Sequence, residues 1–333
     1  PPFVSTVYKN IINNSKIKTD MFCSVIRYPK DSFMFKSINE ILHFISKFKM
    51  YSEETSFIRT VDEKLISNVK RQNTIIRIIE DAIKNNGIEM FLQPIYNIEE
   101  ETFSNAEALV RLKDNKTIGF ISPDEFIPLA EKNGLITNLS DCIFNQTFSF
   151  MSENNLDSLG VKHIEVNLSA IQSVDPDLPS YIENLINRKK LHPQSINLEI
   201  TESTAISTNS LLMQNMKKNK NLGCSFSMDD FGTGYSNLSQ IAKIDYELIK
   251  LDKSLLWPCF DEKNPDKEEA KIILENMISM ILKLGKKIVV EGVETEEQFN
   301  YLKSLNVNYI QGYYFSKPLS MKDYLEFIKK NNS

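Results

Sequence analysis

The sequence predicts an α/β fold, a TIM-type (β/α)8 barrel whose first strand is antiparallel to the others. Eight short apolar, β-branched runs alternate with amphipathic helical patterns from about residue 88 onward, and a barrel of this type needs about 250 residues. The first two runs are joined by the acidic link 98–102, which is too short for a crossover helix and therefore predicts an antiparallel pair. The alternative is an open doubly wound sheet, but no G-x-G-x-x-G turn supports it.

The barrel elements follow from two periodicities. Compact runs rich in Val, Ile and Phe that end in polar residues predict strands, and apolar residues three or four apart predict helices. The predicted strands are Met90–Tyr96, Ala106–Leu112, His163–Leu168, Ile196–Ile200, Ser225–Met228, Leu248–Leu251, Lys287–Val290 and Tyr309–Gln311. The predicted helices are Pro123–Lys132, Leu139–Ser152, Leu178–Arg188, Ser210–Asn219, Ala270–Leu284 and Glu296–Leu305.

A different pattern precedes the barrel. Lys9–Ile12 and Ile38–Phe48 predict helices, with the apolar stretch Met21–Tyr28 between them. Leu65–Asn86 predicts one long amphipathic helix. Since a segment of some 65 residues is small for an independent domain, we expect a small α/β segment at 1–64, a linker helix at 65–87 and the barrel domain at 88–333.

Charge and composition exclude some partners. The net charge of −5 and pI of about 5.5 give no attraction for nucleic-acid polymers or anionic membranes. A phosphate-ester substrate would instead need bound divalent metal to offset the acidic protein. The scattered Cys23, Cys142, Cys224 and Cys259 suit free thiols in a reducing cytosol. No apolar run of about 18 residues and no signal peptide is visible. We expect a cytoplasmic location without membrane contact, although the start at Pro1 leaves an upstream sensor or membrane segment open.

Oxygen-bearing side chains recur where the predicted strands end. The catalytic groups of such barrels gather at the carboxyl ends of the strands. Carboxylates and amides without histidine or cysteine suit Mg²⁺ or Mn²⁺ better than zinc. The adjacent Asp229 and Asp230 suggest two metals sharing a ligand, an arrangement used for attack on phosphodiesters. The residues at the strand ends are Glu107, Asn167, Glu199, Glu202, Asp229, Asp230, Lys250, Asp252, Glu291 and Gln311.

Each of these features also has a simpler explanation. Glu107 and Arg111 could form an ion pair on a helix, Asn167 could be a turn residue, and Asp229-Asp230 could cap a helix. Asp230-Phe231-Gly232 resembles a kinase motif, but no Gly-rich loop or H-R-D-like loop accompanies it. The shared position at one end of successive strands favours a single site.

Together these motifs resemble the EAL family. The resemblance covers about residues 88–330, and Leu112 stands where the family often has tryptophan. The matching motifs are Gln93-Pro94-Ile95, Glu107-Ala108-Leu109, Val166-Asn167-Leu168-Ser169-Ala170, Glu199-Ile200-Thr201-Glu202-Ser203, Asp229-Asp230-Phe231-Gly232-Thr233-Gly234-Tyr235-Ser236, Lys250-Leu251-Asp252-Lys253-Ser254, Glu291-Gly292-Val293-Glu294-Thr295 and Gln311-Gly312-Tyr313.

The resemblance implies hydrolysis of cyclic di-GMP to linear pGpG with two Mg²⁺ or Mn²⁺ ions. We expect Ca²⁺ to bind but inhibit, because its bonds to oxygen are longer than those of Mg²⁺. The resemblance also implies a homodimer near the loop after Asp230. A cyclic di-GMP receptor without turnover and a phosphodiesterase for other nucleotides are the alternatives. The resemblance implies that one metal is bound by Glu107, Asn167, Glu199 and Asp229, and the other by Asp229, Asp230 and Glu291. It implies catalytic roles for Lys250, Glu291 and Glu202, and substrate contacts from Gln93, Arg111 and Gln311. Glu202 and Glu294 would support the site.

The segment before the linker helix resembles the last third of a GGDEF domain. The run Ser24–Asp31 and the helix at Ile38–Phe48 carry this resemblance. No G-G-D-E-F motif occurs, so we expect no cyclase activity from this chain. An unrelated helical cap is the alternative.

Overall fold

A computed structural model of the chain describes residues 23–25, 58–60, 63–113, 118–206, 210–233, 241 and 244–332. The helices predicted at Lys9–Ile12 and Ile38–Phe48, and most of the GGDEF-like run, lie outside these residues. In the described part that precedes the barrel, β1 (Cys23–Val25) pairs in parallel with β2 (Ile58–Thr60).

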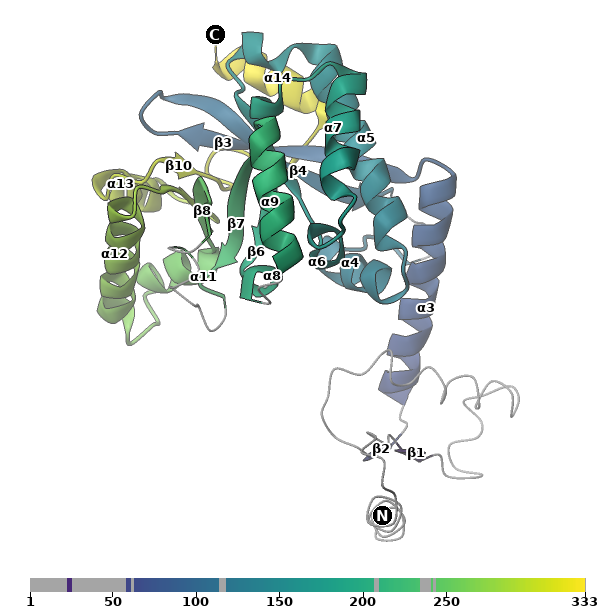
Figure 1. The fold of residues 1–333 in the computed structure, drawn as a ribbon. Helices are drawn as coiled ribbons and strands as arrows, with labels where there is room; N and C mark the ends of the chain where they lie inside the picture. The colour runs from purple at the N-terminus through teal and green to yellow at the C-terminus, as the bar shows by residue number, and fades with distance from the viewer. Residues whose placement is uncertain are drawn as a thin grey trace.

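Eight strands close into the predicted barrel (Figure 1). Their order around the barrel follows the sequence from β3 to β10, and β10 then pairs with β3. The first strand, β3, is antiparallel to both of its neighbours, whereas the others run parallel. The strands are β3 (Ile88–Asn97), β4 (Thr102–Leu112), β5 (His163–Asn167), β6 (Ile196–Thr201), β7 (Ser225–Phe231), β8 (Leu248–Leu251), β9 (Lys287–Val290) and β10 (Tyr309–Ile310), with β11 (Leu319–Ser320) added to the edge of β3.

The reversed first strand results from a tight hairpin. Residues 98–101 form the turn between β3 and β4. The Asn97 side chain accepts hydrogen bonds from the backbone N–H groups of Glu99 (3.0 Å) and Glu100 (3.2 Å), and Glu101 has a φ of +54°. A turn of this length forces the chain to return beside itself, so the antiparallel pairing predicted from the short link is confirmed.

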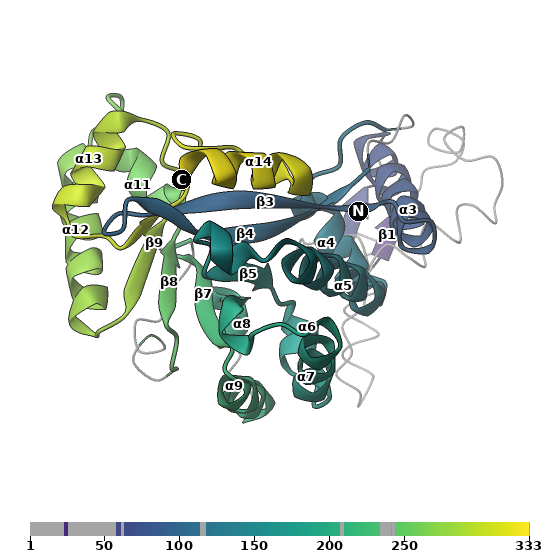
Figure 2. The same ribbon diagram turned by 90° about the horizontal axis from the view of Figure 1, so that it is seen from above.

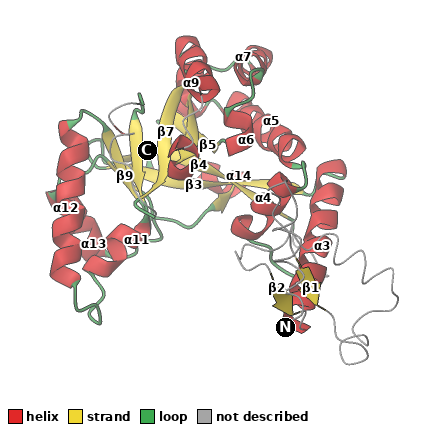
Figure 3. Cartoon of the chain, turned by 60° about the horizontal axis from the view of Figure 1, so that its bottom comes forward, coloured by secondary structure: helices red, strands yellow, loops and turns green. Residues whose placement is uncertain are grey.

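Helices alternate with the strands and surround the barrel. Figure 3 shows α12 and α13 on one side of the strands and α5, α7 and α9 on the other. The predicted helices are confirmed with ends shifted by a few residues. The helices are α4 (Pro123–Lys132), α5 (Ile136–Asn154), α6 (Ala170–Ser173), α7 (Leu178–Lys189), α8 (Glu202–Ile206), α9 (Ser210–Leu222), α11 (Lys253–Leu256), α12 (Lys267–Lys283), α13 (Glu296–Ser304) and α14 (Met321–Asn331), with short 3-10 helices η2 (Leu156–Leu159), η3 (Pro193–Ser195) and η4 (Trp257–Cys259).

Helix α3 (Glu63–Lys84), at the position where the sequence predicts a linker helix, lies beside α4 (Figure 2). In its second half, the buried residues Ile75, Ile79 and Ala82 share one face and belong to the main core. The Arg71 guanidinium forms two bonds with the Glu125 carboxylate of α4, at 2.5 and 2.8 Å. The helix therefore packs against the barrel through both apolar contacts and an ion pair. Within the described residues, none of the helices is long and apolar enough to cross a bilayer.

Alternation along the strands separates two kinds of interior. Outward-facing residues such as Ile164, Leu198 and Phe226 pack under the helices in the main core. Inside the barrel, a small apolar cluster is formed by Ile95, Leu248, Val289 and Tyr309. The remaining inward positions near β4 to β8 are polar, including the buried Asn105, Glu107, Glu165, Asn197, Glu199, Ser227 and Lys250. The polar half of the interior leads to the carboxyl ends of the strands.

Candidate active site

Four carboxylates surround the ammonium group of Lys250. Lys250 is 0% exposed, and its Nζ lies 2.8 Å from Glu199 Oε1 and 2.8 Å from Glu291 Oε1. Glu107 Oε2 is at 3.1 Å and Asp229 Oδ1 at 3.4 Å. These residues come from β4, β6, β7, β8 and the loop after β9. The structure thus brings together five side chains that the sequence places at separate strand ends.

Strand register explains this convergence. Asn167 on β5 is paired with Glu199 on β6, and Thr201 on β6 with Asp229 on β7. Because the strands are parallel and residues two apart share a face, Glu199 and Asp229 lie on neighbouring strands and point into the barrel. Lys250 lies on the next strand, β8, and also points inward.

Amide side chains hold Glu107 in place. Asn167 Nδ2 donates to Glu107 Oε1 at 3.0 Å, and Gln311 Nε2 donates to Glu107 Oε2 at 2.7 Å. Gln311 Nε2 also donates to Gln93 Oε1 at 3.1 Å, and Gln93 Nε2 donates to the carbonyl of Ser316 at 3.2 Å. Two of the three predicted substrate contacts, Gln93 and Gln311, therefore lie beside the acidic cluster.

The charges in this cluster are strongly coupled. Burial lowers the pKa of Lys250, but the surrounding carboxylates, Asp229 and Glu107 first, raise that pKa well above its usual value. Burial raises the pKa of Glu199 well above normal and that of Glu291 to about 8. For Glu107, burial is outweighed by Lys250 and by the amide hydrogen bonds, so its pKa is lowered. One lysine is too little positive charge for so many buried carboxylates, and the site favours added protons or cations.

The remaining predicted site residues lie around this cluster. Arg111 lies with its guanidinium carbon 5.9 Å from the centre of the Phe91 ring, and its Nη1 donates to the carbonyl of Val110 at 2.8 Å. Asp230 has a left-handed φ of +57°, and burial followed by the Asp229 charge raises its pKa to about 6. Glu202 Oε2 accepts from the backbone N–H of Gly232 at 3.3 Å, which ties α8 to the loop after β7.

Two predicted positions near the strand ends lie outside the cluster. The side chain of Glu294 is exposed, and its backbone N–H donates to Gln298 Oε1 at 2.8 Å in the first turn of α13. Asp252 follows Lys250 by two positions, and its charge contributes, after burial and the Asp229 charge, to the raised pKa of Asp230. Strand β8 ends at Leu251, and Asp252 Oδ1 accepts from Ser254 N at 2.9 Å as the cap of α11.

Comparison with protein families identifies this arrangement. The profile of the family described as "EAL domain" matches residues 76–318, which include every strand of the barrel. The chain belongs to the EAL domain family. This confirms the resemblance given by the motifs, although the GGDEF-like segment lies outside the match.

Curated EAL relatives are named as enzymes of cyclic di-GMP turnover. The chain is 35% identical over 254 residues to "Probable cyclic di-GMP phosphodiesterase PdeG" of Escherichia coli, covering 75% of this chain and 48% of that protein. It is 30% identical over 251 residues to "Cyclic di-GMP phosphodiesterase NbdA" of Pseudomonas aeruginosa, covering 75% and 31%. The chain thus spans about half or less of the length of these relatives.

A solved EAL structure shares the fold. "PaMucR Phosphodiesterase, c-di-GMP complex" superposes with a TM-score of 0.69 at 28% identity, over 75% of this chain and 99% of that one. The "Crystal structure of FimX EAL domain from Pseudomonas aeruginosa bound to c-di-GMP" superposes with a TM-score of 0.66 at 23% identity over 74% and 97%. At that identity the likeness to the second structure shows the fold alone.

The EAL family is generally metal-dependent, and the donors in this chain fit a hard cation. All are carboxylate or amide oxygens. Neither carboxylate oxygen of Glu199 nor Oδ1 of Asp229 accepts a hydrogen bond of good geometry, although all are buried. As placed, no three Asp, Glu, His or Cys side chains in the described part of the chain surround a point where an ion could lie; Lys250 lies among the carboxylates instead.

Sequence reasoning missed Glu165. This residue is fully buried on β5, opposite Glu107 in the register, and Asn105 Nδ2 donates to its Oε1 at 3.3 Å. Burial raises the pKa of its carboxyl. The alternation His163-Ile164-Glu165-Val166-Asn167 could have found it, because Glu165 shares the inward face with Asn167.

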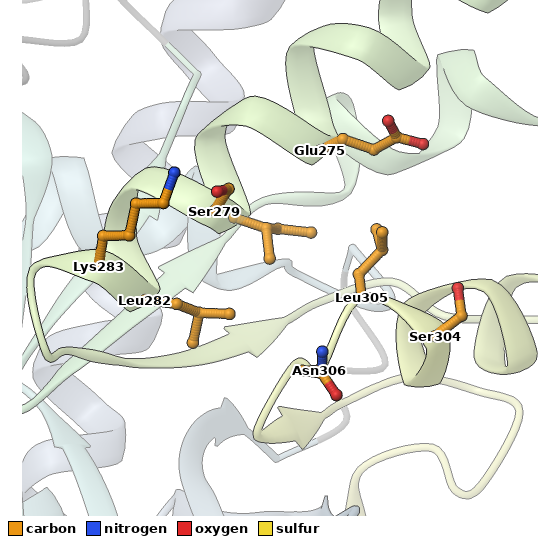
Figure 4. Close-up of a pocket in the computed structure, with 8 residues that line it drawn as sticks. Glu275, Ser279, Leu282, Lys283, Ser304, Leu305 and Asn306 are labelled. Atoms are coloured by element: carbon orange, nitrogen blue, oxygen red, sulfur yellow. The ribbon is translucent and has the colours of Figure 1, made fainter.

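A surface hollow lies away from this cluster. It measures about 460 Å³ and is formed by α12 and α13 with the turn after α13, where Glu275, Leu282 and Leu305 line it (Figure 4). No residue that lines it was predicted as a site residue. Its position on the outer layer separates it from the strand ends.

Proposed function

We propose that this EAL domain hydrolyses cyclic di-GMP to linear pGpG. The observation that carries the proposal is the convergence of Glu107, Glu199, Asp229 and Glu291 on the buried Lys250. The names of its relatives, at about one-third identity, support the same substrate. A structural relative in complex with cyclic di-GMP supports it further.

The acidic cluster would hold two divalent cations, Mg²⁺ or Mn²⁺. Bound cations supply positive charge to the phosphate and lower the pKa of a coordinated water. The proposed ligands are Glu107, Asn167, Glu199 and Asp229 for one ion, and Asp229, Asp230 and Glu291 for the other.

Residues of the chain would then orient the reactants. Water adds across one phosphodiester: its oxygen forms a bond to phosphorus, the bond from phosphorus to the 3′-oxygen breaks, and that oxygen gains a proton. Lys250, held as a cation by its neighbours, would stabilise the negative charge that grows on the phosphoryl oxygens. Gln93, Arg111 and Gln311 would contact the substrate. Glu202 would brace the loop after β7 through Gly232, and Glu294 would support the loop after β9.

The surrounding chain would link this domain to others. We propose a GGDEF-like segment at 1–64, a linker helix at 65–87 and the phosphodiesterase domain at 88–333. We also propose a homodimer near the loop after Asp230. Sedimentation analysis of the chain tests the dimer, and a purely monomeric protein would refute it.

A turnover assay tests the proposal. The purified chain, supplied with Mg²⁺ and cyclic di-GMP, should release pGpG, as measured by chromatography. EDTA or Asp229→Asn should abolish turnover, because a shared carboxylate both binds and spaces the cations. Binding without turnover would refute the enzyme and favour a receptor. Equal rates on other cyclic and linear dinucleotides would refute the substrate. Asp229→Asn activity within about tenfold of wild type would refute the metal assignment.

A further inference from the structure

Trp257 joins the loop after β8 to the loop after β9. It is the only tryptophan of the chain, and its indole Nε1 donates to the carbonyl of Gly292 at 2.8 Å. Gly292 directly follows Glu291, whose carboxylate contacts Lys250. One side chain from the β8 loop therefore holds the backbone next to Glu291.

The two loops fit closely at this contact. Gly292 has a φ of +68°, and a Cβ at this position would lie 2.4 Å from the Cβ of Lys253 and 3.2 Å from Trp257 Nε1. Only glycine fits both this backbone conformation and this space. The ammonium of Lys253 also lies 5.1 Å from the Trp257 ring centre, a cation–π distance.

The backbone on either side of Gly292 is held by other strands. Glu291 N–H donates to the carbonyl of Leu251 at 2.9 Å, and Val293 N–H donates to that of Gln311 at 3.2 Å. The Gly292 carbonyl between them accepts from the Trp257 side chain. Inside the barrel, the side chains of Lys250 and Glu291 also link the β8 and β9 segments. If Glu291 turns toward a cation, its contact with Lys250 changes. The hydrogen bond from Trp257 to the Gly292 backbone can stay the same.

We propose that Trp257 is a positioning residue, which fixes the backbone of Glu291 so that its carboxylate reaches a divalent cation. This inference rests on the proposed function, because it takes Glu291 as a metal ligand. Groups that orient metal ligands typically contribute about 10-fold to 100-fold to metal affinity. Trp257 is 41% exposed, so replacing it creates no large internal cavity. The loss of Mg²⁺ affinity should therefore be about tenfold, the lower end of this range.

The test measures Mg²⁺ affinity by calorimetry, without substrate. Trp257→Phe removes the N–H donor and keeps an aromatic ring. Since the chain has one tryptophan, growth in a tryptophan auxotroph can also replace Trp257 with a tryptophan analogue. In this analogue a sulfur atom stands in place of the indole N–H, so the donor is lost while the shape of the ring system is kept. The control Tyr301→Phe removes a hydrogen bond made by another aromatic side chain, from Tyr301 Oη to Glu275 Oε1 at 3.0 Å.

Both Trp257 replacements should weaken Mg²⁺ binding about tenfold, and Tyr301→Phe should change it by less than about twofold. In a Glu291→Gln background, Trp257→Phe should have no further effect beyond about twofold, because the indole acts through Glu291. Wild-type affinity in the sulfur analogue, or full additivity in the double variant, would overturn the positioning role.

These outcomes separate the two proposals. If the wild type binds Mg²⁺ but cleaves no cyclic di-GMP, the proposed function fails and the affinity comparison still decides the role of Trp257. If the wild type cleaves cyclic di-GMP and the Trp257 variants bind Mg²⁺ normally, the positioning role alone fails. A wild type that binds no Mg²⁺ overturns both.

Discussion

Replacing Lys250 by methionine should destabilise the metal-free protein and make it depend on divalent cations for stability. The substitution keeps the length of the side chain but removes the charge that lies within 3.4 Å of four carboxylates. In the variant these carboxylates repel one another in a buried site. Added cations can take over the role of the lost ammonium group.

The magnitude follows from the burial of the group. Removing one partner of a buried ion pair costs about 3–5 kcal/mol, because the other charge stays buried without compensation. Partial protonation moderates this cost: burial raises the pKa of Glu291 to about 8, so this carboxyl can be neutral at pH 7. At about 2–4 °C per kcal/mol for a domain of this size, the melting temperature in EDTA should fall by about 6–20 °C.

Thermal unfolding in EDTA and in Mg²⁺, followed by circular dichroism, measures both effects. Lys287→Met is the matched control, since the side chain of Lys287 on the next strand is 47% exposed and pairs with Glu247 at 3.2 Å; it should cost less than about 1 kcal/mol. Mg²⁺ should raise the melting temperature of Lys250→Met more than that of the wild type. Equal stability of Lys250→Met and wild type in EDTA would refute the electrostatic reasoning.

Three further predictions follow from the geometry. Ca²⁺ should bind but suppress Mg²⁺-supported turnover, because its oxygen bonds of about 2.3–2.6 Å are longer than those of Mg²⁺, about 2.0–2.1 Å; full activity in Ca²⁺ alone would contradict a closely spaced pair of ions. Arg71→Glu and Glu125→Arg should each lower the free energy of unfolding by up to about 1 kcal/mol, and the double variant should recover part of that loss. Denaturant unfolding of the four proteins measures the coupling energy between the two residues. A coupling energy of zero would refute their ion pair (2.5 Å). Gly312→Ala should lower stability by about 1–3 kcal/mol, because its Cβ would lie 2.0 Å from the Val293 carbonyl oxygen. The thermal-unfolding control is Gly285→Ala, which meets no atom within 4 Å and carries only the backbone strain of a φ of +70°, about 1 kcal/mol; a loss at Gly312 no larger than that of the control would argue against the clash.

The sequence by itself determined the barrel and the residues that line the carboxyl ends of its strands. Period-two alternation depends only on neighbouring residues, so the strands and their inward faces could be predicted from local pattern. The short link after Tyr96 was enough to predict the reversed first strand, because chain length alone limits how far the next strand can lie. Closure of the barrel then brings Glu107 and Gln311 together, although they are 204 positions apart.

Only the tertiary structure decided how these side chains meet. Lys250 was predicted as a site residue, but its place among four carboxylates depends on the register of five segments. Asp252 has the spacing of a strand residue, but the strand ends one position earlier and the Asp252 side chain caps helix α11. The hydrogen bond from Trp257 to Gly292 leaves no mark in the local sequence, because it joins a side chain to a backbone carbonyl 35 positions away. Contacts of this kind depend on how whole elements pack, and a local pattern contains no information on that packing.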